Sequence, residues 1–113
     1  MIKIYHNNRC KKSRLGVKLL EKMGCNFEIV NYLINPITKE TLKTLIKALD
    51  MQPIDLVRTN EALWKYEFKG KPLSDDEIIN AMLSHPKLIE RPIVTNGNKA
   101  VVGRPTERIQ EIV

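Results

Sequence analysis

The order of secondary structure predicted for the first part of the chain is the feature that most limits its fold. Ile2–Tyr5 is a short apolar segment typical of a buried strand, and Lys11–Met23 carries leucines at helical spacing, with Gly24 where a helix C-cap belongs. Phe27–Val30 is predicted as a second strand. Strand, helix and strand in this order form a βαβ unit, so the two strands should be parallel and joined by a right-handed crossover.

The end of the chain predicts a different arrangement. Asn96-Gly97 is a strong hairpin signal, and it lies between two strand-like segments, Pro92–Thr95 and Asn98–Val102. Pro105 suits the first position of a terminal helix, in which two isoleucines are expected to be buried. This part of the chain is therefore predicted to form a ββα unit.

Several helices are predicted between these two units. Thr38 can cap one amphipathic helix, and Ser74 begins a capping box ahead of another. Shorter helices are expected around Ile54–Val57 and Asn60–Glu67. The predicted fold class is α/β: a thioredoxin-like fold with βαβ and ββα halves, a mixed four-stranded sheet and inserted helices, in a single domain over residues 1–113.

The composition agrees with a globular chain. Hydrophobic residues make up 42% and charged residues 28% of 113 residues, and no apolar run approaches the roughly 20 residues that span a bilayer. The N-terminus lacks the apolar core of a signal peptide, so we expect a cytoplasmic protein in which Cys10 and Cys25 stay reduced. The net charge of +6 favours anionic partners without distinguishing nucleic acid, acidic protein and small oxyanions.

The densest chemical feature is the segment Arg9-Cys10-Lys11-Lys12-Ser13-Arg14, at the junction of the first strand and the first helix. Four cations at this position are electrostatically unfavourable, because the helix dipole favours negative charge at the N-terminal end of a helix. A thiolate or a bound oxyanion would compensate, because the free N–H groups of a helix start bind anions. The alternative is a solvated basic turn around an ordinary cysteine, and charge alone does not decide between them.

A lowered thiol pKa explains little of the rate of such a nucleophile. A fall from ~8.5 to ~6.5 raises the thiolate fraction at pH 7 from roughly 3% to roughly 75%. Intrinsic nucleophilicity falls by roughly tenfold over the same range, so the net gain is only about two- to threefold. Several positive donors must therefore converge on the sulfur and the anion.

Three arginines are candidates for these donors: Arg58, Arg91 and Arg104. Each lies just outside a predicted helix or strand, and two of them directly precede a proline. An arginine binds a tetrahedral oxyanion well because its planar guanidinium donates two hydrogen bonds and stays charged. For any single arginine, a solvating surface role is the simpler interpretation.

The remaining polar residues suggest weaker hypotheses. His6 and Asn7 precede the cysteine, where bracing of the loop is favoured over tuning of the thiol. His85 is expected to end a helix, and Cys25 to fill space in the packing. Two cysteines and two histidines without ligand spacing predict no metal site. The aromatic residues near Trp64 are better explained by packing than by stacking on nucleic acid, which is not expected as a partner.

Four motifs in order resemble the glutaredoxin-coupled arsenate reductase (ArsC) family over essentially the whole chain. They are Tyr5-His6-Asn7 with Cys10-Lys11-Lys12-Ser13-Arg14, then Val57-Arg58-Thr59-Asn60-Glu61, then His85-Pro86 with Leu88-Ile89-Glu90-Arg91-Pro92-Ile93-Val94, and Gly103-Arg104-Pro105.

The resemblance implies roles for several residues in these motifs. Cys10 would be the nucleophile, and Arg58, Arg91 and Arg104 would bind the oxyanion. The residues His6, Ser13 and Asn7 would support the thiolate and its loop, and Pro92 would follow a cis peptide bond. Asn8 departs from the pattern, because many members have a proline at this position.

The resemblance also implies the partners. Arsenate would be reduced to arsenite with glutathione and glutaredoxin as external thiols, by a monomer with no bound cofactor or metal. Two alternatives stay open: a redox or stress regulator of the same fold that binds RNA polymerase, and a thiol reductase of another substrate. Such regulators typically carry Cys-x-x-Cys, whereas this chain has Ser13 at the second position.

Overall fold

The computed structural model describes all residues, 1–113, and its contacts divide the chain into two compact units. The first unit contains residues 1–35 and 91–113, and the second contains residues 36–90. The first unit therefore combines the predicted βαβ and ββα segments, and the second contains the helices predicted between them. None of the helices is both long and apolar enough to cross a membrane.

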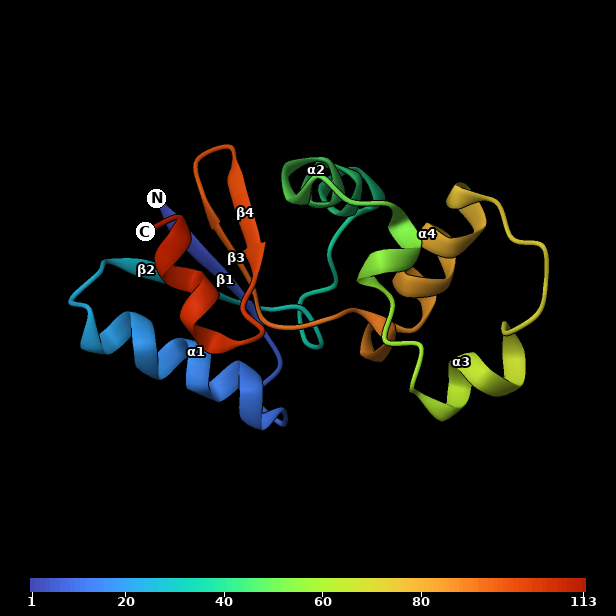
Figure 1. The fold of residues 1–113 in the computed structure, drawn as a ribbon, viewed down its shortest axis with the longest axis horizontal. Helices are drawn as coiled ribbons and strands as arrows, with labels where there is room; N and C mark the ends of the chain where they lie inside the picture. The colour runs from blue at the N-terminus through green and yellow to red at the C-terminus, as the bar shows by residue number, and fades with distance from the viewer. The chain divides into compact units, whose positions relative to one another are not determined.

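The first unit is built around a mixed four-stranded sheet in the order β2-β1-β3-β4 (Figure 1). The strands are β1 (Ile2–His6), β2 (Phe27–Asn31), β3 (Ile93–Asn96) and β4 (Lys99–Val102). β1 pairs in parallel with β2 and antiparallel with β3, and β3 forms a hairpin with β4. The predicted α/β class, the parallel pair and the hairpin are confirmed.

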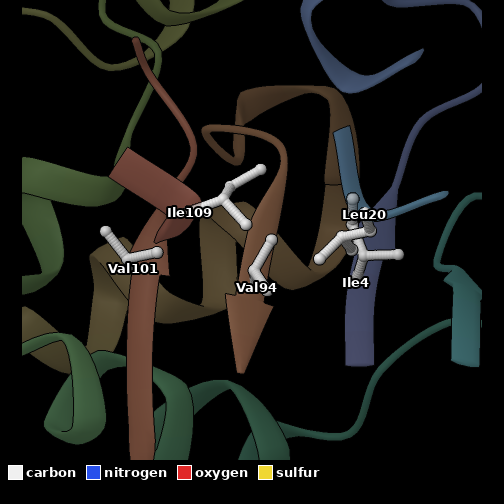
Figure 2. Close-up of a cluster of buried hydrophobic side chains, with 5 residues drawn as sticks. All are labelled: Ile4, Leu20, Val94, Val101 and Ile109. Atoms are coloured by element: carbon white, nitrogen blue, oxygen red, sulfur yellow. The ribbon is translucent and has the colours of Figure 1, made fainter. Parts of the chain in front are cut away.

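The core of the first unit lies between the sheet and two helical segments, α1 (Lys11–Lys22) and η3 (Thr106–Glu111). Figure 2 shows its five buried side chains, which come from three strands and both helical segments: Ile4, Leu20, Val94, Val101 and Ile109. These strand residues are directly paired across the sheet, so they share one face. Burial of this face holds α1 against β1, which places the start of α1 beside the loop that leaves the strand.

The second unit is helical. Its elements are α2 (Lys39–Leu49), η1 (Pro53–Leu56), α3 (Ala62–Glu67), α4 (Asp75–Ser84) and η2 (Pro86–Leu88). The predicted caps are present: the side chain of Thr38 accepts from the N–H of Thr41, and Ser74 and Glu77 form a reciprocal capping box. An isolated bridge between Val57 and Ile89 ties the segment after η1 to the segment after η2.

The terminal helix differs from its prediction. Pro105 is not its first residue, because Pro105 has extended backbone (φ −63°, ψ 162°). The Arg104–Pro105 peptide bond is cis. The helix begins at Thr106 and has 3₁₀ geometry over six residues. Ile109 is fully buried as expected, whereas Ile112, just after the helix, is only partly buried.

Candidate active site

Cys10 is the residue that caps the N-terminus of α1. Its backbone is extended (φ −96°, ψ 122°), and its N–H donates to the Asn7 carbonyl oxygen at 3.0 Å, which closes the loop between β1 and the helix. No acidic side chain lies in the first turn of α1. The sulfur therefore lies at the positive end of the helix dipole, although its side chain makes no capping hydrogen bond.

The surroundings of Cys10 lower the pKa of its thiol. Burial raises this pKa, but a hydrogen bond from the Arg91 guanidinium and the backbone N–H groups of Ser13 and Lys12 act in the opposite direction. The net result is a fall from 9.0 to about 7. About half of the thiol is therefore ionised at neutral pH, in a side chain that is only partly buried.

Two of the three predicted arginines converge on this sulfur. Arg104 Nη2 lies 3.4 Å from Cys10 Sγ, and its Nε donates to the backbone oxygen of Arg91 at 2.7 Å. Arg91 itself is only 8% exposed. Two guanidinium groups beside one thiol form a cationic site that suits a tetrahedral oxyanion.

Both arginines are placed by the segments around β3 and β4. Each precedes a cis proline, at Arg91–Pro92 and Arg104–Pro105. The N–H of Gly103 donates to the Pro92 carbonyl oxygen at 2.8 Å, so the two segments are joined by backbone as well as side-chain hydrogen bonds. The hairpin therefore brings together two arginines that are thirteen residues apart in sequence.

Hydrogen bonds among His6, Ser13 and Asn7 form a buried network that braces the loop. His6 Nδ1 lies 2.7 Å from Ser13 Oγ, which also accepts from the N–H of Asn7 at 3.0 Å. Asn7 Oδ1 accepts in turn from the N–H of Arg9. Burial and the nearby Arg14 lower the pKa of His6, so its imidazole is neutral at pH 7. Ser13 acts on the sulfur through its backbone N–H and on the loop through its hydroxyl.

Sequence reasoning assigned no specific role to Arg14 or Gly16. Arg14 Nη1 donates to the Asn8 carbonyl oxygen at 3.0 Å and so fastens the loop where many members of the resembled family have proline. A Cβ atom on Gly16 would lie 2.9 Å from Pro92 Cγ, so this glycine allows α1 to approach the cis proline. A glycine inside a predicted helix was the only available signal.

Arg58 belongs to the second unit. Its Nη1 forms an ion pair with Glu61 Oε1 at 3.1 Å, and its N–H donates to the Leu88 carbonyl oxygen at 2.7 Å. These contacts hold Arg58 at the start of the Thr59-Asn60 turn. The contribution of Arg58 to the oxyanion site therefore remains a prediction.

The other candidates have local packing contacts. Cys25 is a free thiol that packs against the core of the first unit, at the end of α1 opposite to Cys10. His85 ends α4, and its ring meets Phe68 edge to face. Phe68 also stacks on the buried Trp64. Packing therefore accounts for Trp64 and Phe68, as expected, whereas Tyr66 of the same segment is 88% exposed.

Comparisons with known proteins cover the whole site. The ArsC family model matches residues 5–112, a segment that includes Cys10 and all three arginines. The protein named Uncharacterized protein YfgD, from Escherichia coli (strain K12), is 45% identical over 99% of this chain and 96% of its own. An arsenate reductase of Neisseria meningitidis serogroup A is 40% identical over 99% of this chain and 97% of its own. A solved structure of an arsenate reductase from Vibrio cholerae is 41% identical in sequence and has a TM-score of 0.94. The match covers 99% of this chain and 97% of the Vibrio cholerae chain.

Proposed function

We propose that this chain, which belongs to the ArsC family, reduces arsenate to arsenite through a covalent adduct on Cys10. The observation that carries the proposal is the Cys10 thiol, with a pKa lowered to about 7 and two guanidinium groups, Arg91 and Arg104, beside it. An oxyanion in this site would be close to its nucleophile and neutralised by cations. The similarity to proteins named arsenate reductase supports arsenate as that oxyanion.

In the first step, the Cys10 thiolate attacks the arsenic atom of arsenate. A sulfur–arsenic(V) bond forms, one arsenic–oxygen bond breaks, and the oxygen leaves as water after taking up a proton. The lowered pKa supplies the thiolate at neutral pH. At neutral pH the thiolate fraction is roughly fiftyfold larger than that of a thiol with a pKa of 9.0. The lower nucleophilicity of this thiolate reduces the resulting gain in rate by about tenfold. The arginines must therefore supply most of the stabilisation of the transition state.

The second stage needs two electrons, which two external thiols supply. A glutathione thiol displaces a second oxygen from arsenic as water and forms an arsenic–sulfur bond. A glutaredoxin thiol then attacks the glutathione sulfur, a mixed disulfide forms, and the electron pair of the broken bond reduces arsenic(V) to arsenic(III). Water then displaces arsenite and regenerates the Cys10 thiol.

Cys25 does not fit the role of an internal reductant. It follows α1 whereas Cys10 precedes it, and a helix of twelve residues is about 18 Å long. A disulfide requires Cα atoms within about 7 Å of each other. The reductants are therefore taken to be separate molecules, which suits the reducing cytoplasm that we propose as the location.

A coupled assay with arsenate, glutathione and glutaredoxin tests the proposal. We expect arsenite to form with the wild-type protein, to be absent with C10S, and to form at an unchanged rate with C25S. The absence of Cys10-dependent arsenite across several thiol donors would exclude the reaction. In that case a regulator of the same fold, or a reductase of another substrate, becomes the better interpretation.

A further inference from the structure

The positive charge of the chain is concentrated in the first unit. Its segments 1–35 and 91–113 contain eleven Lys and Arg against four Glu, which gives +7, whereas residues 36–90 contain eight against nine Asp and Glu, which gives −1. Within the first unit, residues 9–22 hold six cations and the single carboxylate Glu21. The unit that carries Cys10 is therefore the cationic part of the molecule.

Four of these cations form a stripe along α1, which we call the α1 stripe: Lys11, Arg14, Lys18 and Lys22. Their spacings of three, four and four residues place them on one face of the helix. All four are exposed, and the opposite face of α1 carries the buried residues Ser13, Gly16 and Leu20. The stripe therefore points away from the core and begins next to Cys10.

The stripe is not explained by the stability of α1. Like charges at i,i+4, as in the pairs Arg14/Lys18 and Lys18/Lys22, destabilise a helix by a few tenths of a kcal/mol each. Lys11 and Arg14 also lie at the end of the helix where the dipole disfavours cations. No lysine of the stripe forms an ion pair, although Glu21 lies beside it. An external anionic surface would remove this repulsion.

We propose that the α1 stripe is the docking surface for an acidic protein that delivers its reactive thiol to the glutathione–arsenic adduct on Cys10. This inference rests on the proposed function, because that function needs a thiol from another molecule. A protein seated along α1 would reach the cysteine at the start of the helix, where the stripe begins. Complementary charges of this kind mainly raise the rate of association, which suits a partner that must leave after each turnover.

An acidic protein fits the stripe better than a nucleic acid does. Binding of a single strand uses aromatic side chains on which bases stack, and α1 contains none. The cations also lie on one straight helix face of about 18 Å, and the adjoining positions are Leu15 and Leu19, both partly buried. The leucines can supply apolar contact to a protein partner, with the cations as the polar rim of the interface.

The experiment uses two charge-reversal variants with the same spacing. K18E/K22E reverses the far half of the stripe, which touches neither Cys10 nor the two arginines. K43E/K47E is the matched control, because Lys43 and Lys47 are exposed and four residues apart on α2 in the second unit. Both variants change the net charge equally, so a difference between them reports on the stripe.

Docking is measured by trapping, without arsenate. An acidic glutaredoxin is prepared with its active-site sulfur in a disulfide to thionitrobenzoate. The Cys10 thiolate attacks that glutaredoxin sulfur, a protein–protein disulfide forms, and the thionitrobenzoate that leaves with the electron pair is recorded by its absorbance. The neutral reagent 4,4′-dithiodipyridine measures the intrinsic reactivity of Cys10 in each variant.

At low salt, we expect K18E/K22E to slow trapping by at least about tenfold relative to wild type and K43E/K47E. The difference should shrink as salt screens the charges. All variants should react equally with dithiodipyridine. Equal trapping rates for the two double variants would overturn the docking surface. Tighter binding of the stripe to a DNA duplex than to the glutaredoxin would also overturn it, in favour of nucleic acid.

The outcomes for docking and for arsenate reduction are separable. If trapping depends on the stripe but no arsenite forms in the coupled assay, the docking surface stands and the proposed reaction fails. If arsenite forms at wild-type rates with both double variants and trapping is also equal, the reaction stands and the docking surface fails.

Discussion

The guanidinium of Arg104 connects two parts of the site: its Nε donates to the Arg91 carbonyl oxygen at 2.7 Å, and its Nη2 lies 3.4 Å from Cys10 Sγ. A guanidinium is planar and rigid, so fixing one nitrogen fixes the direction of the others. The backbone bond to Arg91 therefore orients the donor that faces the nucleophile, before any anion binds.

This relationship predicts that lysine cannot replace Arg104. R104A should lower kcat/KM for arsenate by roughly 100- to 1000-fold, the usual cost of losing one preorganised donor. R104K keeps the charge, but a single ammonium group cannot bond the Arg91 oxygen and face the sulfur together, so most of the loss should remain. Coupled arsenite assays measure the effect, with circular dichroism as the folding control. Near-normal reduction by folded R104A would disprove the role of Arg104 at the oxyanion site.

Arg91 is expected to matter for stability as well as for activity. The sequence placed Arg91 just outside a predicted strand, where a solvating surface role is the simpler interpretation, but Arg91 is only 8% exposed. R91A should therefore lower the free energy of unfolding by about 1–3 kcal/mol, in addition to lowering kcat/KM.

The effect of R91A on the thiol distinguishes these two roles. Loss of the guanidinium should raise the pKa of Cys10 from about 7 towards its ordinary value. The control is R108A, because Arg108 is half exposed and pairs only with Glu111 at the surface. A Cys10 pKa unchanged in R91A would contradict the proposed interaction.

Several helices and the hairpin could be predicted from sequence because their signals are local. The leucines of α1, the Asn96-Gly97 turn and the Ser74 capping box each depend on a few neighbouring residues, and each is confirmed. The motifs around Cys10 and Arg91 likewise identified the family.

The parts that sequence could not predict depend on contacts between distant residues. Gly16 of α1 packs closely against Pro92, which precedes β3. No local sequence pattern predicts that these two residues are in contact. The predicted start of the terminal helix was wrong by one residue, because nothing in the neighbouring sequence indicates the extended backbone of Pro105. The bond of Ser13 to His6 also required the helix and the strand to be packed together.

The titration of Cys10 gives a prediction with a definite sign. The thiolate absorbance that C10S lacks should appear with a midpoint near pH 7. The folded pKa lies below the unfolded one, so the thiolate stabilises the fold fully above the unfolded pKa, and this contribution is lost as the pH falls through about 7. The free energy of unfolding of wild type, relative to C10S, should therefore rise between about pH 7 and pH 9. A difference that stays constant over this range would contradict the lowered pKa.

Ser13 allows stability and thiol chemistry to be separated. S13A removes the hydroxyl that partners His6 Nδ1 and the Asn7 N–H in a fully buried position, so unfolding free energy should fall by about 1–3 kcal/mol. Alanine keeps the backbone N–H that acts on the sulfur, so the Cys10 pKa should stay near 7. Chemical denaturation and thiolate absorbance measure the two quantities. A large rise of the pKa without loss of stability would show that the hydroxyl, not the backbone, acts on the thiol.

Gly16 tests the packing that joins α1 to the segment of Arg91. In an exposed helix position, replacing glycine by alanine stabilises by about 1 kcal/mol. At Gly16 the new Cβ would lie 2.9 Å from Pro92 Cγ and 3.2 Å from Ile4 Cδ1, so α1 or the proline must move. Overpacking of this kind costs about 1–3 kcal/mol, and we expect G16A to be less stable than wild type. It should also lower arsenate reduction, because displacement of Pro92 displaces Arg91. The exposed Lys18 of the same helix gives the control K18A, which should leave unfolding within about 0.5 kcal/mol of wild type. A more stable G16A with full activity would show that α1 and Pro92 are not closely packed.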